Sequence, residues 1–436
     1  MGHSQEQARI GRLRLNTNQL VWIATLMVVV WYPFNHIYLY HVITGNIPDI
    51  IRGVLRILVL LFSVAFGFFM LNQLSRRKLP ILSIVIMGIF TTFVALIILW
   101  IVAHYLLAEG PKGSMLVFEY YSRALFLYFF LFLAGIYMRP QVCNSIWLAF
   151  FVLIFINSII YYDSNNMMID LSCVIDKAYS GMYLSLSDTA MFSGFIAWSV
   201  AKKPITRVAC LCLLGVVLFI TGSRANFIGY LMVLPVALSF TLRRSTQIVF
   251  YCVIVLGAAI AFSLLGGWEM LAGSRYIRLL SISEDPSWIA RQDFLFMGIN
   301  DIMQNPVFGN YDEQFEYRGT IGPYIHNWLS VWQAFGIIPF LLYTSLVFIG
   351  IYQAARTFWL SGRSAACQDQ LIAVFCLLAT VLVLAAKSMG WVHISLVWGM
   401  LTAKFLNSGS SNNLKRIPRK GVTSKEIMRV VNDCAK

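Results

Sequence analysis

Charged side chains are scarce in this sequence. They make up 12% of the 436 residues, whereas hydrophobic residues make up 59%. A soluble protein of this length carries about twice that share of charge, so the composition excludes a soluble globular class and indicates a polytopic membrane protein. The length therefore does not translate into several globular domains.

Acidic residues are the rarer charge, with 19 against 33 lysines and arginines and a net charge of +14. The basic excess lies mainly in short connections between apolar segments, where it sets membrane orientation, so we expect no nucleic-acid partner.

Of the eight cysteines, only Cys173 falls in a connection that we assign to the outer side, and a structural disulfide is therefore not expected. The sequence shows no internal repeat and no cleavable signal peptide.

Apolar segments are abundant, and a segment of about 20 residues suffices to cross the hydrocarbon layer. We expect an all-α fold of about twelve transmembrane helices, forming one domain over residues 1–407 and followed by a basic tail at 408–436. The expected spans are 20–40, 53–72, 80–107, 115–138, 145–162, 188–201, 207–222, 225–242, 248–266, 327–354, 371–387 and 389–406.

Lysine and arginine concentrate in every second connection and in both tails, which predicts that both termini are cytoplasmic. The opposite side receives two long loops, 163–187 and 267–326. In the second loop, Ser287–Gln304 predicts a helix lying along the membrane surface, because apolar residues recur at helical spacing and Asn305-Pro306 ends the pattern. We expect Ser287 to cap this helix.

Several residues at the outer side suit the binding of an anion. Arg224 lies in a short link before a span whose N-terminus points outward, and guanidinium and helix N–H groups together favour phosphate; an interfacial anchor is the alternative. Arg291 lies in the surface helix, where a solvated face is the alternative. Three further loop arginines cannot be ranked against it: Arg275, Arg278 and Arg318.

His326 directly precedes an expected span and can take a proton near neutral pH, although a histidine bonded to a carbonyl is the commoner case. No two histidines show the spacing of zinc ligands, so no metal is expected.

Arg123 lies inside a span four residues after Glu119, which favours an ion pair; a place facing the substrate cavity is the alternative. Tyr183 and Asp188 begin the sixth span and are candidates to line the same cavity.

Three motifs occur in order around the long loop: GSRANFIGYL at 222–231, WIARQDFLFMGINDIMQNPVFGNY at 288–311 and HNWLSVWQAFGIIPFLL at 326–342. With them the chain resembles the O-antigen ligase and O-antigen polymerase superfamily of bacterial envelopes. The shared pattern is an arginine after Gly-Ser, an arginine-led helix ending in Asn-Pro-x-x-Gly, and His-Asn before a span with Gly ten residues later.

This resemblance implies a GT-C-like glycosyltransferase of the bacterial inner membrane, with its site facing the periplasm. The donor would be a glycan on undecaprenyl diphosphate, and neither a metal nor a nucleotide sugar would be needed. By position, Arg224 and Arg291 would hold the diphosphate, while His326 would activate the acceptor hydroxyl or orient the diphosphate; Asn327 belongs to the same motif.

Two activities fit the motifs equally. A polymerase joins repeat units on two lipid carriers, and a ligase moves the finished polymer onto lipid A–core. We favour the polymerase, because nothing in the sequence marks a lipid A–core site. A transporter of lipid-linked oligosaccharide or of a small molecule is the alternative from another class, although it predicts two similar halves that we do not find.

Overall fold

The structure is a computed structural model that describes residues 17–43, 79–107, 113–163, 168–169, 182–251, 285–311 and 325–414, with scattered positions between 54 and 72. Its elements are α1 (Thr17–Val29), η1 (Val30–Phe34), α2 (Asn35–Ile43), α4 (Ile81–Leu107), α5 (Gly113–Tyr137), η2 (Pro140–Cys143), α6 (Asn144–Ile160), β1 (Tyr162–Asp163), β2 (Met168–Ile169), α7 (Met182–Val200), α8 (Pro204–Ile220), α9 (Arg224–Thr241), α12 (Pro286–Gln304), α14 (Ser330–Phe335), α15 (Ile337–Leu360), η6 (Gly362–Ser364), α16 (Cys367–Ala385) and α17 (Ile394–Leu414). The described chain is therefore almost entirely helical.

Seven helical segments of the described chain are long and apolar enough to cross a membrane, which confirms an all-α membrane protein. They are Thr17–Val42, Ile81–Leu106, Met115–Tyr137, Pro140–Ile160, Arg224–Thr241, Ile337–Leu360 and Cys367–Ala385, with Pro204–Ile220 and Ile394–Leu406 as shorter apolar helices. The expected spans 53–72 and 248–266 lie largely outside the described residues. The total of twelve stays a prediction.

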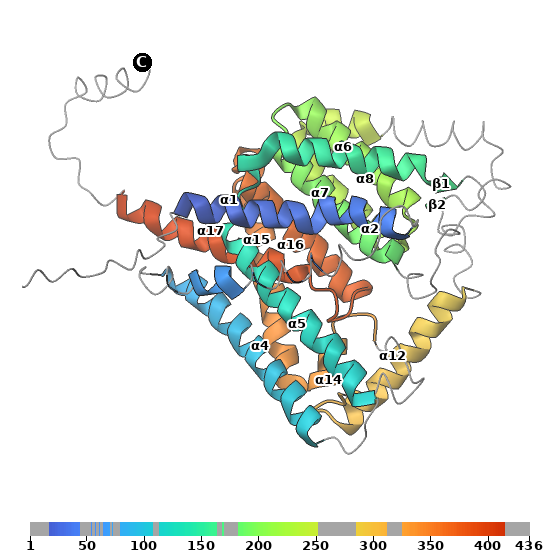
Figure 1. Cartoon of the computed structure of the whole chain (residues 1–436). Helices are drawn as coiled ribbons and strands as arrows, with labels where there is room; N and C mark the ends of the chain where they lie inside the picture. Colours follow the sequence, from blue (N-terminus) through green and yellow to red (C-terminus); the bar gives the residue numbers. More distant parts are fainter. Residues whose placement is uncertain are drawn as a thin grey trace, which may run out of the picture.

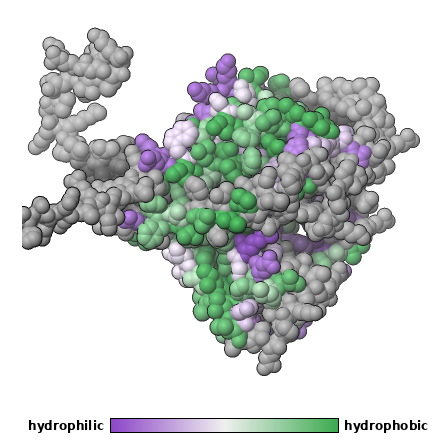
Figure 2. Space-filling view, viewed as in Figure 1, coloured by the Kyte–Doolittle hydropathy of each residue, from purple (hydrophilic) through white to green (hydrophobic). Residues whose placement is uncertain are grey.

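The helices form one bundle with an exposed apolar surface. In Figure 1 the start of α1 and the end of α17 lie on the left, whereas the β1–β2 hairpin and α12 lie on the right. Figure 2 shows hydrophobic surface running along the flank of the bundle, with hydrophilic residues gathered in separate patches. An apolar flank of this kind suits contact with lipid, since lipid-facing positions of a membrane helix carry no penalty for hydrophobic side chains.

Two glycines allow α5 and α17 to pack backbone against backbone. A Cβ added at Gly135 would lie 2.3 Å from the carbonyl oxygen of Leu396, and one added at Gly399 would lie 2.1 Å from that of Phe132. Small residues at helix crossings are the usual basis of close packing in membranes, where apolar side chains gain nothing by leaving lipid. This contact fixes α17, the last helix that the structure describes, to α5.

The tenth expected span is wrong in its first part. The chain forms the short helix α14 after His326, breaks at Gly336, and starts the long helix α15 only at Ile337. Gly336 has φ +80°, and a Cβ there would lie 2.0 Å from the carbonyl oxygen of Val307. His326 is therefore separated from the long helix α15 by the short helix α14 and by a kink at Gly336 that packs against Val307.

The bounds of the surface helix are confirmed within one residue, since it begins at Pro286 and ends at Gln304. Its expected N-cap is wrong, because the side chain that accepts from the Ser287 N–H is the Asp285 carboxylate.

The start of the last expected span is also wrong. The expected spans leave only residue 388 between 387 and 389, whereas α16 ends at Ala385 and α17 begins at Ile394. The Met389 N–H of this link donates to the Ser330 hydroxyl of α14 and not to a helical carbonyl.

The α5–α17 contact gives a direct test of the fold. We expect Gly399→Ala to destabilise the protein by about 3 kcal/mol, because the added methyl group meets a backbone oxygen that cannot move aside. The measurement is the unfolding temperature of the purified protein in detergent. The control is Gly88→Ala in α4, where an added Cβ meets nothing within 4 Å, and equal effects of the two variants would contradict the packing.

Candidate functional site

The site begins at the first turn of α9. Gly222, with φ +72°, makes the sharp turn out of α8, and Arg224 is the first residue of α9. No side-chain cap bonds to the free N–H groups of this turn. Ser223 Oγ and Asn226 Oδ1 are also buried here with no hydrogen-bond partner among the described residues. Free N–H groups, a helix dipole and an arginine together favour an anion.

Asp285 connects α9 to the surface helix. Its Oδ2 forms an ion pair with Arg224 Nη1, while its Oδ1 accepts from the Ser287 N–H at 3.1 Å. The Arg224 side chain is only 17% exposed and the Asp285 side chain only 6% exposed. One carboxylate thus caps α12 and neutralises Arg224 at the same time, and the start of α12 is fixed at the start of α9.

Arg291 lies in the second turn of α12, close to this ion pair. Burial, and after it the charge of Arg224, lower the pKa of Arg291 below its ordinary value, while Tyr183 and Asp285 act in the opposite direction. Asp285 is thus ion-paired with Arg224 and acts on Arg291 only through its charge. Among the described residues of this site, the two arginines together carry one positive charge more than Asp285 can balance.

The His326 segment is held beneath α12. Gly298 of α12 packs so closely on this segment that an added Cβ would lie 2.3 Å from the Ile325 side chain. Gln333 accepts from the Ile325 N–H at 3.1 Å and donates to Asp301 of α12 at 3.3 Å. The ring of Phe294, also on α12, lies 6.1 Å from that of His326. The surface helix thus positions Arg291 and His326 together.

His326 is neutral at ordinary pH in this setting. Burial, followed by the positive charges of Arg291 and Lys387, lowers the pKa of His326 to about 4. A neutral imidazole has one unprotonated ring nitrogen, which is a hydrogen-bond acceptor. The site therefore places a neutral imidazole close to the positive charge of Arg291 and Lys387.

A second buried charge cluster lies behind His326. Lys387 Nζ donates to both oxygens of Asp188, at 2.9 and 3.0 Å, and Asn226 of α9 donates to the same carboxylate at 2.8 Å. His393 Nε2 lies 4.0 Å from Asp188, and His393 Nδ1 lies 3.0 Å from the Tyr32 hydroxyl. The cluster joins α7, α9, η1 and the link before α17 in one polar network.

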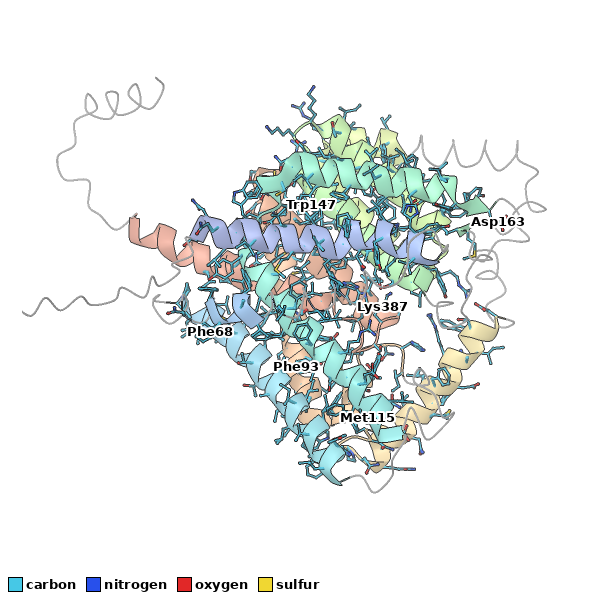
Figure 3. All side chains as sticks on the ribbon, viewed as in Figure 1. Phe68, Phe93, Met115, Trp147, Asp163 and Lys387 are labelled. Atoms are coloured by element: carbon cyan, nitrogen blue, oxygen red, sulfur yellow. The ribbon has the colours of Figure 1, made fainter. Side chains whose placement is uncertain are left out.

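Two hydrogen bonds bring this network against the His326 segment. The Trp328 N–H donates to the Val383 carbonyl at 2.8 Å, and the Met389 N–H donates to the Ser330 hydroxyl at 2.9 Å. Lys387 lies between the two anchors in sequence, and Figure 3 shows it on the side of the bundle that faces α12. Its charge is thereby placed within electrostatic range of His326.

The sequence identified this second cluster only in part. Asp188 is predicted to line the cavity, whereas no motif in the sequence singles out Lys387 or His393. A lysine between two strongly apolar helices was the available signal, since an unpaired charge there is costly. Its partner could not be found from the sequence, because Asp188 lies 199 residues away.

Comparison with known proteins adds no family to this geometry. The chain matches no protein-family model, and no curated protein is significantly similar to it. The interpretation of the site therefore depends on the residues themselves and on the motifs described above.

The remaining predicted residues differ in how they relate to this geometry. Tyr183, in the first turn of α7, interacts electrostatically with Arg291. Asn327 uses its side-chain oxygen to accept from the Leu329 N–H at 2.9 Å, which stabilises the turn before α14.

Arg123 lies at an exposed position of α5, as does Glu119. Three arginines lie outside the described residues: Arg275, Arg278 and Arg318. Within the described ranges, no group of three or more acidic, cysteine or histidine side chains is arranged to hold a metal ion.

The Asp188–Lys387 pair allows a double-mutant test. We expect Lys387→Met to destabilise the protein by about 3–5 kcal/mol, because it leaves a buried carboxylate without its cationic partner. Adding Asp188→Asn should restore most of the loss, since the remaining amide is neutral. The measurement is the unfolding temperature of the four proteins in detergent. Strictly additive losses would show that the two charges do not interact.

Proposed function

We propose that this protein transfers a glycan from a lipid diphosphate to a sugar hydroxyl at the membrane surface. The observation that carries the proposal is the arrangement of Arg224, Arg291 and His326 around one end of α9 and α12. Arg224 is ion-paired with Asp285 there, and Arg291 lies within electrostatic range of that pair and of the neutral His326. A diphosphate leaving group needs this kind of fixed positive charge, since its charge grows as the bond to the sugar breaks.

The reaction is a single displacement. The acceptor hydroxyl oxygen forms a bond to the anomeric carbon of the donor sugar, and the bond from that carbon to the diphosphate oxygen breaks. The configuration at the carbon is inverted. Arg224 and Arg291 bind the departing diphosphate through paired N–H groups. The proton of the hydroxyl passes to His326 or to the diphosphate that leaves.

Binding of the donor also prepares His326 for this role. In the free protein, burial and after it the charges of Arg291 and Lys387 lower the pKa of His326. A bound diphosphate opposes these charges and raises the proton affinity of the imidazole. His326 is therefore a stronger base with the donor in place than in the free protein.

The donor we propose is a glycan on undecaprenyl diphosphate, as the resemblance of the three motifs implies. The favoured acceptor is a second lipid-linked glycan, so that the protein acts as a surface-polysaccharide polymerase. Lipid A–core is the alternative acceptor, and the protein would then be an O-antigen ligase. The setting we propose is the bacterial inner membrane, with the site facing the periplasm.

Deletion of the gene separates these two activities. Gel analysis of the surface glycan should show a single repeat unit on the core if the protein is a polymerase. Free lipid-linked polymer together with bare core would instead indicate a ligase. Unchanged surface glycan after deletion would contradict both.

Point variants test the roles of the residues. We expect Arg224→Ala, Arg291→Ala and His326→Ala each to lower glycan transfer about 10²–10³-fold, as the loss of one positioned group does in other enzymes. Arg224→Lys should keep the ion pair with Asp285 but lack the paired N–H groups for phosphate, so it should not restore activity.

The matched control is Lys203→Gln, which removes one exposed positive charge at the opposite end of the bundle. Transfer is measured by the glycan pattern of complemented cells, and membrane levels of each variant by immunoblot. Normal glycan from the Arg224→Lys protein would contradict the phosphate-binding role of Arg224.

A further inference from the structure

A separate cavity of about 610 Å³ lies at the other end of the bundle. It is open to the outside and is lined by the end of α15, the start of α16, the start of α4 and the second half of α17. Because α16 runs from this cavity to Lys387, the cavity and the Arg224–His326 site lie at opposite ends of the same helix. No residue of the proposed transfer site lines it.

The cavity wall contains a buried hydrogen-bond acceptor without a donor. Gln353 is 1% exposed, and its Nε2 donates to Thr357 Oγ1 at 2.9 Å. Thr357 Oγ1 also accepts from Lys404 Nζ at 3.1 Å. Gln353 Oε1 is buried with no hydrogen-bond partner among the described residues. Such an acceptor is costly unless a ligand or solvent group donates to it.

Among the described residues that line the cavity, the basic side chains carry one more charge than the acidic ones. Lys404 Nζ forms an ion pair with Asp369 at 3.2 Å. Arg356 also lines the cavity and has no acidic partner within the described part of the chain. An occupant that complements this wall therefore carries one negative charge and at least one hydrogen-bond donor.

The apolar part of the wall indicates what kind of molecule carries this negative charge and this hydrogen-bond donor. Leu82, Ile372 and Phe405 line the cavity, and Leu360 lines it while remaining 75% exposed. An occupant can thus place its polar part in the cavity and continue along the apolar flank of the helices. This combination is typical of a membrane lipid and not of a free metabolite.

We propose that this cavity binds the headgroup of an anionic phospholipid of the phosphatidylglycerol type. Its single phosphate charge faces Arg356 and Lys404, and a glycerol hydroxyl donates to Gln353 Oε1. Phosphatidylcholine has no net charge and no hydroxyl or N–H donor, so it does not satisfy the wall. Soluble glycerol phosphate shares the polar chemistry but lacks the acyl chains.

Native mass spectrometry of the full-length protein in detergent tests the proposal. We expect retention of phosphatidylglycerol in preference to phosphatidylcholine, with bound lipid raising the unfolding temperature. Arg356→Gln should weaken retention about tenfold, as expected for the loss of one charge-assisted hydrogen bond. Gln353→Met, which has a similar shape but no acceptor, should also weaken it.

The matched control is again Lys203→Gln, an exposed positive charge at the same end of the bundle but outside the cavity. It should retain phosphatidylglycerol like the unaltered protein. Equal weakening by Lys203→Gln and Arg356→Gln would overturn the proposal in favour of unspecific charge attraction. Equal retention of both lipids, or equal stabilisation by soluble glycerol phosphate at the same concentration, would overturn it as well.

Discussion

The ion pair between Arg224 and Asp285 is the constraint on which the arrangement of the site depends. It joins the start of a spanning helix to the start of the surface helix, and the same carboxylate caps the surface helix. Removing the pair would free the start of α12, where Arg291 lies, whereas Asp301 and Gly298 hold the later turns against the His326 segment. Because Asp285 both caps α12 and neutralises Arg224, the charge of Arg291 is left for an anion to balance among the described residues.

Asp188 has the equivalent role on the other side of His326. It holds Lys387 through both carboxylate oxygens and Asn226 through one of them. Asn226 lies two residues after Arg224, so the two acid-centred clusters meet at the first turn of α9. Arg291 and Lys387 act electrostatically on the histidine, and Arg224 and Lys387 are each held by a carboxylate before any substrate binds. Such prior positioning is what makes electrostatic stabilisation effective, since no group has to reorient during the reaction.

Local patterns in the sequence predict the helical character of the described chain and the bounds of α12, because apolar periodicity and Asn305-Pro306 act over a few residues. They missed the features that depend on distant contacts. Gly336 breaks the helix only because the Val307 carbonyl lies against it, and Asp285 caps α12 only where Arg224 holds it. The positions of Arg224 and His326 beside apolar segments make them candidates, and only the resemblance singles out Arg291 among the four loop arginines, whereas the partners of Lys387 require the fold.

The central claim is that this group of cations binds a lipid diphosphate. Its most direct test is native mass spectrometry of the purified protein with undecaprenyl diphosphate and undecaprenyl monophosphate. The account predicts preferential retention of the diphosphate and loss of that preference in the Arg224→Gln, Arg291→Gln double variant. Equal retention of the two lipids, or a preference that survives in the double variant, would contradict it.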